Sequence, residues 1–344
     1  MFQPNYIITN RLLEHIKRIN MLVFELNHRR FSSIVLATFE KTAEAVSTYA
    51  STSIEGNPLP LTEVKKVLKS KPTYIRNSER EVLNYNQALQ ELNQRLHKKN
   101  TSISLDLILY IQKQVTDGLL PQFESGKFRQ KPVVVNDPKS HKVAFLPPNV
   151  EDVLPLMSEL VTYVHENKGR IDPLILAGIF HKQMVIIHPF MDGNGRTTRL
   201  TTKVLLAQMG LNTFNLFSFE NYYNQNISRY FQTVGEFGDY YELREKINFT
   251  AWLEYFTEGI IDELLRVQKL LPKTETSPQT QLRPHDLKLL SYIKENGFIT
   301  DRIYADLITR AKATRTQDFK RLLSFGLIDR KGKGKATYYV VKEE

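Results

Sequence analysis

The sequence predicts a mainly α-helical protein with one small β-hairpin and a small mixed α and β domain at the C-terminal end. Three observations carry this prediction. Apolar residues recur at helical spacing through most of residues 8–270. Residues 128–146 instead have the short β-branched pattern of paired strands. After a polar stretch at 271–284, two helical patterns precede a second pair of strand patterns.

The N-terminal region is helical in pattern. Apolar residues recur at helical spacing through residues 8–50, and further helical patterns follow at 61–68 and 79–96. Core packing alone explains such stripes, so we infer no ligand from them.

The stretch 51–58 contains one unexpected residue. Gly56 can end a helix and Pro58 cannot easily continue one, so an ordinary helix C-terminus accounts for most of the segment. Glu55 does not fit this explanation, because the helix dipole disfavours a carboxylate at the C-terminal end.

The middle of the chain combines helices with the predicted hairpin. A helix is expected over 103–119, beginning near Ser104, and another follows Asn149. Between them, residues 128–135 and 142–146 predict two strands, and the polar cluster 136–141 predicts their turn. A hairpin that binds a partner and a hairpin that only covers the core both fit this pattern.

The most informative stretch is His188 to Arg199, which lies between two apolar runs. Residues 173–187 indicate a buried helix, and residues 200–209 indicate a second helix with Gly210 as its stop. The stretch is therefore a predicted loop whose glycines stand at the start of the second helix.

That position suits an anion. The first turn of a helix has N–H groups without an internal partner and carries the positive end of the dipole. Gly193 and Gly195 allow the backbone to approach a ligand closely and to form an anion nest. Arg196 and Arg199 are three residues apart, and both can donate to phosphate oxygens.

Two further residues of the stretch add chemistry. Asp192 would repel a phosphate unless a divalent cation lay between them, which predicts Mg²⁺. His188, with an ordinary pKa of about 6.5, can take a proton from a hydroxyl group. A base, a metal ligand, an anion nest and two arginines are the parts needed for transfer from a nucleoside triphosphate to a hydroxyl.

The C-terminal part is separated by a predicted linker. Residues 281–344 contain 14 Lys and Arg against 8 Asp and Glu, a net charge of +6. Helical patterns at 300–307 and 314–323 followed by a predicted hairpin resemble a winged helix. Such a domain binds DNA through the second helix of the pair, or binds protein instead. The residues expected to contact DNA phosphates are Arg315, Lys320 and Arg321.

Composition sets broad limits. The chain has no cysteine, which excludes disulfides and thiol catalysis, and it contains no apolar run of the ~20 residues that a membrane span needs. The start lacks the layout of a signal peptide, so we expect a cytoplasmic protein. The net charge of +10 fits either an anionic partner or a basic surface without one.

The stretch 188–199 resembles the signature of Fic-domain proteins, His-x-Phe-x-(Asp/Glu)-Gly-Asn-Gly-Arg-x-x-Arg, at every fixed position. The resemblance implies a protein adenylyltransferase that transfers AMP from ATP to Ser, Thr or Tyr of a target protein and releases pyrophosphate. The related Doc toxins, which phosphorylate, resemble a version with altered glycines. Both glycines are kept here, so AMP transfer is the expected activity.

The resemblance also implies residue roles. His188 would be the general base, Phe190 a buried anchor and Asp192 the Mg²⁺ ligand. Arg196 would lie toward the β-phosphate and Arg199 would bind the γ-phosphate. Tyr230 and Phe231 stand where the family often has paired tyrosines near the adenine, although an aromatic pair is more often core. The implied ATP-binding residues are Gly193, Asn194, Gly195, Arg196, Thr197, Thr198, Arg199, Tyr230 and Phe231.

Two other segments resemble parts of the same family. Ser51, Glu55 and Gly56 match the inhibitory motif (Ser/Thr)-x-x-x-Glu-(Gly/Asn), which implies an N-terminal inhibitory helix at about 46–56 and a Glu55 carboxylate paired with Arg199. The hairpin at 128–146 resembles the flap, which pairs with an extended segment of the target protein.

The expected organisation has four parts: a helical region at 1–100, a Fic core at 101–265, a linker at 266–284 and a winged-helix-like domain at 285–344. The first hypothesis is an autoinhibited adenylyltransferase that uses ATP and Mg²⁺. The alternative is a DNA-binding regulator whose Fic core senses nucleotide. The intact His188 favours the enzyme, because sensing alone needs no base. A homodimer is a further expected form of partner.

Overall fold

The computed structural model describes the whole chain except residues 1, 30, 32, 71–73, 98–100, 138–141, 209, 212, 272–282, 326, 333 and 343–344. It divides into two compact units, one comprising residues 1–29 and 37–273 and the other residues 30–36 and 274–344. Most of the predicted linker and most of the hairpin turn lie outside the described residues. No described helix has the length and apolarity needed to cross a bilayer.

The first unit is built mainly from helices. Its strands form one small sheet, and η1 is a single 3-10 turn. The elements are α1 (Asn10–His28), α2 (Ser33–Ile54), α3 (Leu61–Ser70), α4 (Asn77–His97), α5 (Leu105–Val115), β1 (Val135–Asn136), β2 (Val143–Leu146), α6 (Val150–Asn167), α7 (Pro173–Ile187), α8 (Asn194–Ala207), η1 (Thr213–Asn215), α9 (Glu220–Gln225), α10 (Ile227–Val234), β3 (Gly238–Asp239), α11 (Tyr240–Leu243) and α12 (Thr250–Leu270).

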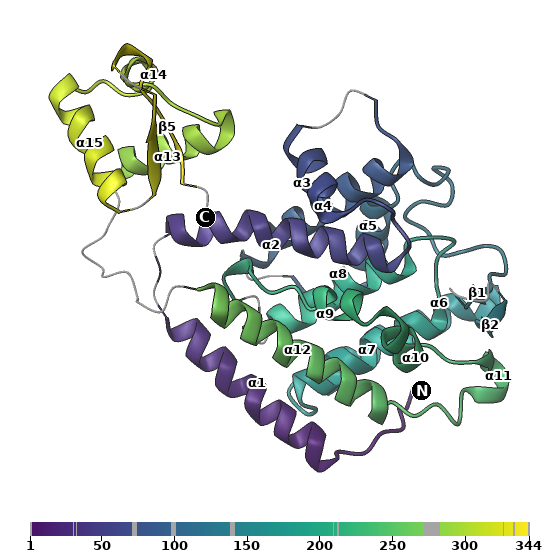
Figure 1. Ribbon diagram of the computed structural model, residues 1–344. Helices are drawn as coiled ribbons and strands as arrows, with labels where there is room; N and C mark the ends of the chain where they lie inside the picture. Colours follow the sequence, from purple (N-terminus) through teal and green to yellow (C-terminus); the bar gives the residue numbers. More distant parts are fainter. Residues whose placement is uncertain are drawn as a thin grey trace. The chain divides into compact units, whose positions relative to one another are not determined.

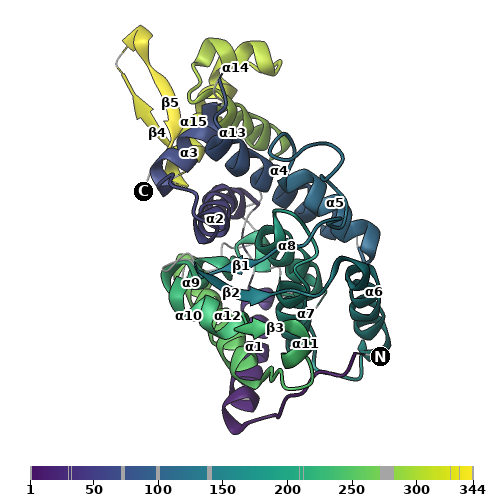
Figure 2. The same ribbon diagram turned by 90° about the vertical axis from the view of Figure 1, so that its right-hand side faces the viewer.

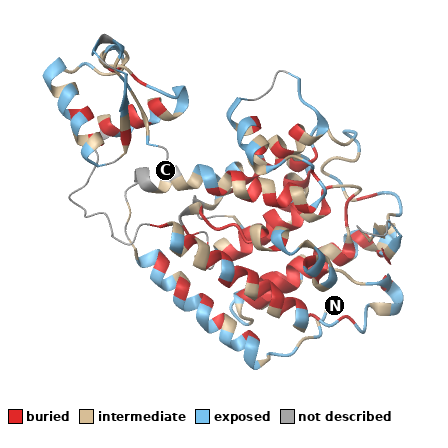
Figure 3. Cartoon of the chain, viewed as in Figure 1, coloured by how far each residue is buried: buried red, intermediate tan, exposed pale blue. Residues whose placement is uncertain are grey.

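Helix α7 is the centre of this unit. Every residue of α7 except Pro173 and Val185 is buried, because α6, α8 and α12 pack against it (Figures 1 and 3). Its apolar run therefore has no polar face, as the sequence predicted. Helix α8 is also buried along most of its length, so the loop between the two helices starts and ends in the core.

The N-terminal residues contain two helices where the pattern at 8–50 gave no division. Helix α1 ends before Arg29, whose backbone is extended, and α2 continues to Ile54. Helix α1 packs along α12, which the two views show as neighbours (Figures 1 and 2). The predicted boundary between residues 100 and 101 stays a prediction.

The predicted hairpin is present, but the strand expected at 128–135 is reduced to Val135–Asn136, since the backbone of Arg129 bonds to Pro189 and not to the second strand. The hairpin belongs to a sheet of three strands in the order β1-β2-β3 (Figure 2). Strand β1 pairs antiparallel with β2, with Val135 opposite Phe145. Strand β3 pairs parallel with β2, with Gly238 opposite Phe145. Strand β3 could not be predicted, because two residues are too few to make a pattern.

The second unit contains three helices followed by an antiparallel pair of strands. Ile299 adds an isolated bridge to Tyr339, which extends that pair. The buried core is formed mainly by Leu289, Leu290, Ile293, Ile299, Tyr304, Phe319, Leu322 and Ile328. The elements are α13 (Pro284–Asn296), α14 (Asp301–Leu307), α15 (Lys312–Ser324), β4 (Ile328–Lys331), η2 (Gly334–Ala336) and β5 (Tyr338–Val341).

Substitution of Gly178 by alanine tests the close contact between α7 and α12. A Cβ at this position would lie 2.6 Å from Cδ2 of Leu253. Alanine has a higher helix propensity than glycine. However, overpacking a core lowers the free energy of unfolding by roughly 1–3 kcal/mol. We expect Gly178→Ala to lower the thermal unfolding midpoint by about 2–4 °C, measured by circular dichroism. An unchanged or higher midpoint would show that the two helices separate easily.

Candidate functional site

His188 lies directly after α7 and begins the loop. Its backbone is left-handed, with φ 49°, and its N–H donates to the carbonyl oxygen of Met184 at 3.2 Å. This conformation is uncommon for a residue with a side chain. It ends α7 and turns the chain toward Pro189.

The loop is closed by the side chain of Asn194. Its Oδ1 accepts from the N–H of Phe190 at 2.9 Å, and its Nδ2 donates to the carbonyl oxygen of Phe190 at 2.9 Å. Phe190 is fully buried, as an anchor of the loop would be. The Asn194 side chain is therefore used inside the protein, which leaves its backbone N–H as the group available to a ligand.

The first turn of α8 follows a left-handed glycine, at the place where the sequence predicts an anion nest. Gly193 precedes the helix with φ 80°, and its N–H donates to Oδ1 of Asp192 at 2.6 Å. The following N–H groups have no acceptor within the helix. Thr197 and Thr198 are buried, and the hydroxyl of Thr198 donates to the carbonyl oxygen of Asn194 at 2.8 Å. The two threonines thus lie behind the nest.

Helix α2 reaches this turn through Ser51 and Glu55. Arg199 is fully buried and donates to both the hydroxyl and the carbonyl oxygen of Ser51 at 2.8 Å. Its Nη2 also donates to Oε1 of Glu55 at 2.7 Å. The structure therefore contains the ion pair between Glu55 and Arg199.

The Glu55 carboxylate also covers Gly195. A Cβ on Gly195 would lie 2.1 Å from Oε1 of Glu55 and 2.9 Å from Nη1 of Arg199. No side chain fits between the carboxylate and the helix backbone. The space that an anion would take at the start of α8 is thus occupied by an anion from the same chain.

Arg196 contacts two carboxylates. Its Nη2 donates to Oδ1 of Asp192 at 2.8 Å, and its Nη1 lies 2.8 Å from Oε1 of Glu81 in α4. The Glu81 carboxylate also accepts from Nδ2 of Asn57 at 2.6 Å, and Asn57 directly follows Gly56. Sequence reasoning missed Glu81, because nothing local distinguishes one glutamate on a polar helix. Burial raises the pKa of Glu81, while the charge of Arg196 opposes this.

The imidazole of His188 is neutral near pH 7. Burial lowers the pKa of His188 to about 4. Among the neighbouring charges, Glu55 and Asp192 act to raise this pKa and Arg129 acts to lower it. A neutral ring can accept a proton, although a pKa this low makes it a weaker base than a free imidazole.

The aromatic pair expected near the adenine is divided between core and surface. The Tyr230 side chain is buried, its hydroxyl lies 3.2 Å from Nε2 of His181, and its ring stacks on Tyr223. Phe231 is only partly buried. In this structure the ring of Phe231 is therefore more accessible to an adenine ring than that of Tyr230.

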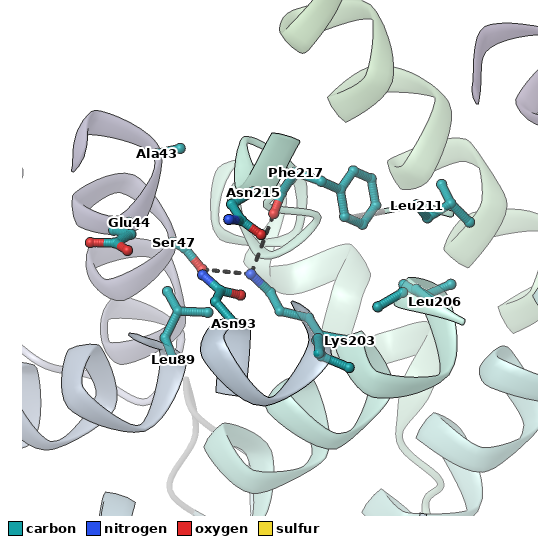
Figure 4. A pocket seen from close by; sticks show the side chains of 12 residues that line it. Ala43, Glu44, Ser47, Leu89, Asn93, Lys203, Leu206, Leu211, Asn215 and Phe217 are labelled. Atoms are coloured by element: carbon teal, nitrogen blue, oxygen red, sulfur yellow. Dashed lines mark hydrogen bonds between the residues drawn. The ribbon is translucent and has the colours of Figure 1, made fainter. Parts of the chain in front are cut away.

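Lys203 lies one helical turn beyond Arg199 and contacts α2 as well. Its Nζ donates to the hydroxyl of Ser47 at 3.0 Å and to the carbonyl oxygen of Phe217 at 3.4 Å (Figure 4). It also forms an ion pair with the buried Glu220 at 3.2 Å. The adjoining cavity is about 30 Å³, room for one water and not for a nucleotide.

Two of the three residues expected to contact DNA phosphates are already paired in the second unit. Arg315 donates to Asp301 at 2.9 Å, and Arg321 donates to Asp286 at 2.6 Å. Only Lys320 of the three is exposed. Arg315 and Arg321 thus have carboxylate partners that net charge alone does not reveal, and their expected contact with DNA phosphates stays a prediction.

Asp286 also belongs to a group of three residues that resembles a metal site. Ligand atoms of His285, Asp286 and Asp318 lie within 4.8 Å of one another. However, Arg321 donates to both carboxylates and the hydroxyl of Tyr304 donates to Asp318. This group is accounted for as a charge network between α13 and α15.

Comparison with known proteins identifies the domain that carries the loop. Residues 102–206 match the model of the Fic/DOC family. The chain contains a Fic domain. The match begins just before α5 and ends within α8, so it includes the flap, the loop and both buried helices.

Curated relatives of the Fic domain carry the name protein adenylyltransferase. The chain is 29% identical over 211 residues to protein adenylyltransferase Fic of Aedes aegypti, covering 59% of this chain and 41% of the relative. It is 32% identical over 191 residues to fic-1 of Caenorhabditis elegans, covering 54% of this chain and 36% of the relative. The chain thus spans about two fifths or less of these relatives.

Solved structures share the fold. A Fic family protein from Desulfovibrio desulfuricans G20 superimposes with a TM-score of 0.66 at 18% identity, covering 100% of this chain and 99% of that chain. Fic-1 from Caenorhabditis elegans (residues 134–508) superimposes with a TM-score of 0.57 at 24% identity, covering 75% and 71%. The mainly helical fold with small sheets agrees with the fold class predicted from the sequence.

The pKa of His188 gives a prediction that needs no substrate. Selectively ¹³C-labelled histidines can be followed by NMR, and His188→Asn identifies the signal. We expect its midpoint near pH 4 because burial disfavours imidazolium. An unfolded chain protonates this ring near pH 6.5, so its contribution to stability falls as the pH is lowered from 6.5 to 4. A midpoint near 6.5 would contradict the burial of the ring.

Proposed function

We propose that the chain is a protein adenylyltransferase that transfers AMP from ATP to a Ser, Thr or Tyr hydroxyl of a target protein and is inhibited by Glu55. One observation carries the proposal. A neutral histidine, a half-exposed aspartate, an anion nest and two arginines occur on one loop between buried helices. The names of the curated relatives support the same activity.

In this proposal the triphosphate binds at the start of α8. The α- and β-phosphates accept from the N–H groups of the first turn, near Gly193 and Gly195. Arg196 is available to the β-phosphate once it leaves Asp192. Nη1 of the buried Arg199 has no partner among the described residues, so it is available to the γ-phosphate.

Asp192 suits Mg²⁺. Its side chain is 47% exposed and lies beside the nest, and Mg²⁺ usually takes one or two carboxylates together with substrate phosphates. Asp192 would hold the ion, and the ion would neutralise phosphate charge. On binding the ion, Asp192 would lose its contact with Arg196.

The transfer itself uses His188 as the base. The ring nitrogen takes the proton of the target hydroxyl while the hydroxyl oxygen bonds to the α-phosphorus. The bond from that phosphorus to the bridging oxygen breaks, and pyrophosphate leaves with the bonding electrons. A protein that only sensed nucleotide would need no base, which makes the alternative of a DNA-binding sensor weaker.

The flap is the proposed binding surface for the target protein. Strand β1 is the edge of the sheet among the described strands, and an edge can pair with an extended segment. Exposed apolar side chains cluster in and around the sheet, namely Val134, Val143, Leu146 and Phe237. They give an extended segment apolar contacts in addition to backbone hydrogen bonds.

Inhibition is proposed to arise from α2. While Glu55 pairs with Arg199, the γ-phosphate cannot use that arginine and ATP binds with its α-phosphate displaced. A displacement of ~1 Å can cost about 10²-fold in rate. The contact also continues along the helices, since Ser47 faces Lys203 one turn beyond the pair formed by Ser51 and Arg199. Helix α2 is thus held at two successive turns.

The second unit is proposed to be a winged helix that binds a macromolecular partner. Because two of its arginines are paired internally, a protein partner is the better supported choice over DNA.

The chemistry is tested by the position of a radioactive phosphate in ATP. With ³²P at the α-phosphate the protein or its target should become labelled, whereas ³²P at the γ-phosphate should leave no label. His188→Ala should reduce labelling by about 10²–10⁴-fold and leave ATP affinity nearly unchanged, because the phosphate ligands remain. Label from the γ-position would indicate a kinase instead, and full activity of His188→Ala would exclude this base.

Removal of the Glu55 carboxylate should release the enzyme. We expect Glu55→Gly to raise labelling at least about tenfold, because Arg199 and the nest become free. Arg199→Ala in that background should abolish the gain. Both are measured at the same ATP and Mg²⁺ concentrations. If Glu55→Gly is no more active than wild type on any substrate, including itself, then Glu55 is only the end of a helix.

The second contact of α2 gives a finer prediction. Ser47→Ala removes the hydroxyl that accepts from Lys203, and a hydrogen bond to a charged group contributes about 1.5–3 kcal/mol. We expect a gain in labelling of a few-fold, smaller than for Glu55→Gly. Ser53→Ala, on the same helix, makes the same change away from Lys203 and is the control. Equal activities of the two variants would show that Ser47 does not hold α2 in place.

A further inference from the structure

Arg129 is a buried cation without a carboxylate partner. Its side chain is 2% exposed, and no Asp or Glu of the described chain lies within 4.0 Å of the guanidinium. Backbone carbonyl oxygens accept its hydrogen bonds instead. Nε donates to the carbonyl oxygen of His188 at 2.9 Å, Nη1 to that of Lys131 at 3.4 Å, and Nη2 to that of Pro148.

Burying Arg129 among carbonyl oxygens costs free energy, and the geometry suits arginine and not lysine. Burial of an unpaired charge is unfavourable, and here it lowers the pKa of Arg129. Only the planar guanidinium can donate in several fixed directions at once, whereas lysine offers a point charge on a flexible stem. The residue therefore organises three separate segments of backbone around one side chain.

One of those segments is the start of the catalytic loop. The carbonyl oxygen that Nε binds belongs to His188, whose backbone has the left-handed φ of 49°. The N–H of Arg129 donates to the carbonyl oxygen of Pro189 at 2.9 Å, and the ring of Phe128 stacks on that of Phe190 with centroids 5.7 Å apart. Residues 128–129 thus lie alongside residues 188–190.

The other two segments are the ends of the flap. Lys131 precedes β1, and Pro148 follows β2. The guanidinium therefore connects both ends of the flap to the backbone of His188. The side chain of Arg129 thus adds to the backbone bond and the ring contact that already connect the flap with residues 188–190.

We propose that Arg129 is a positioning residue for His188, which holds the left-handed backbone of the base and fixes it relative to the flap. This role rests on the proposed function, since it assumes that His188 is the base. Arg129 touches none of the reacting atoms in this proposal. Its charge has a second effect, because it acts to lower the pKa of His188.

Two substitutions separate geometry from charge, each made together with Glu55→Gly so that activity is measurable. Arg129→Met removes both the charge and the donors, while the backbone bond to Pro189 stays. We expect kcat to fall about 10²-fold with ATP affinity changed less than about threefold, and the pKa of His188 to rise. Arg129→Lys keeps a charge but loses the fork. We expect kcat to fall at least about tenfold with the pKa of His188 still low.

Loss of stability alone is controlled with Arg266→Met. Arg266 also donates to a backbone carbonyl oxygen, that of Leu216 at 2.9 Å, and it pairs with the buried Glu263. It lies in α12, and among the described residues it has no hydrogen bond to residues 188–199. This variant should unfold at a lower temperature with kcat and the pKa of His188 unchanged.

The outcomes distinguish this inference from the proposed function. If Arg129→Met and Arg129→Lys keep kcat within about twofold of their background and the His188 titration does not move, Arg129 is not a positioning residue. If Glu55→Gly itself never labels protein, the proposed function fails. NMR titration of His188 in the Arg129 variants then still tests the contact, because an unmoved midpoint in Arg129→Met would overturn it.

Discussion

The site depends on one short contact, between the carboxylate of Glu55 and the first turn of α8. The oxygen that accepts from Arg199 at 2.7 Å also lies where a Cβ on Gly195 would be. A helix N-terminus attracts an anion through its unpaired N–H groups and its dipole. Here α2 supplies that anion intramolecularly. Under the proposed function, the glycine that admits the carboxylate of Glu55 would also admit a phosphate, so one geometry would serve both nucleotide binding and its inhibition.

The two arginines near the loop are likewise paired with carboxylates of the same chain. Three carboxylates, those of Glu55, Glu81 and Asp192, surround Arg196 and Arg199. Each arginine is held in position by these carboxylates, and in the proposed function each would exchange one such contact for a phosphate. His188, the proposed base, is different, since burial lowers its pKa and Arg129 binds its backbone carbonyl oxygen.

The sequence predicted the parts of the site that are contiguous. The loop from His188 to Arg199 and the buried helices beside it follow from local pattern, and the short motif at Ser51 to Gly56 identified Glu55. Glu81, Arg129 and β3 could not be predicted in this way, because their roles arise from contacts between segments far apart in the chain. A lone glutamate, arginine or two-residue strand carries no local signal of its partner.

We propose that Glu55 and the γ-phosphate compete for Arg199. Calorimetry of ATP and ADP binding in the presence of Mg²⁺ tests this most directly, because the two ligands differ only in that phosphate. In wild type the two affinities should be similar. In Glu55→Gly, ATP should gain at least about tenfold over ADP, about 1.4 kcal/mol, and Arg199→Ala should remove that gain. The same ratio of ATP to ADP affinity in wild type and Glu55→Gly would contradict the account.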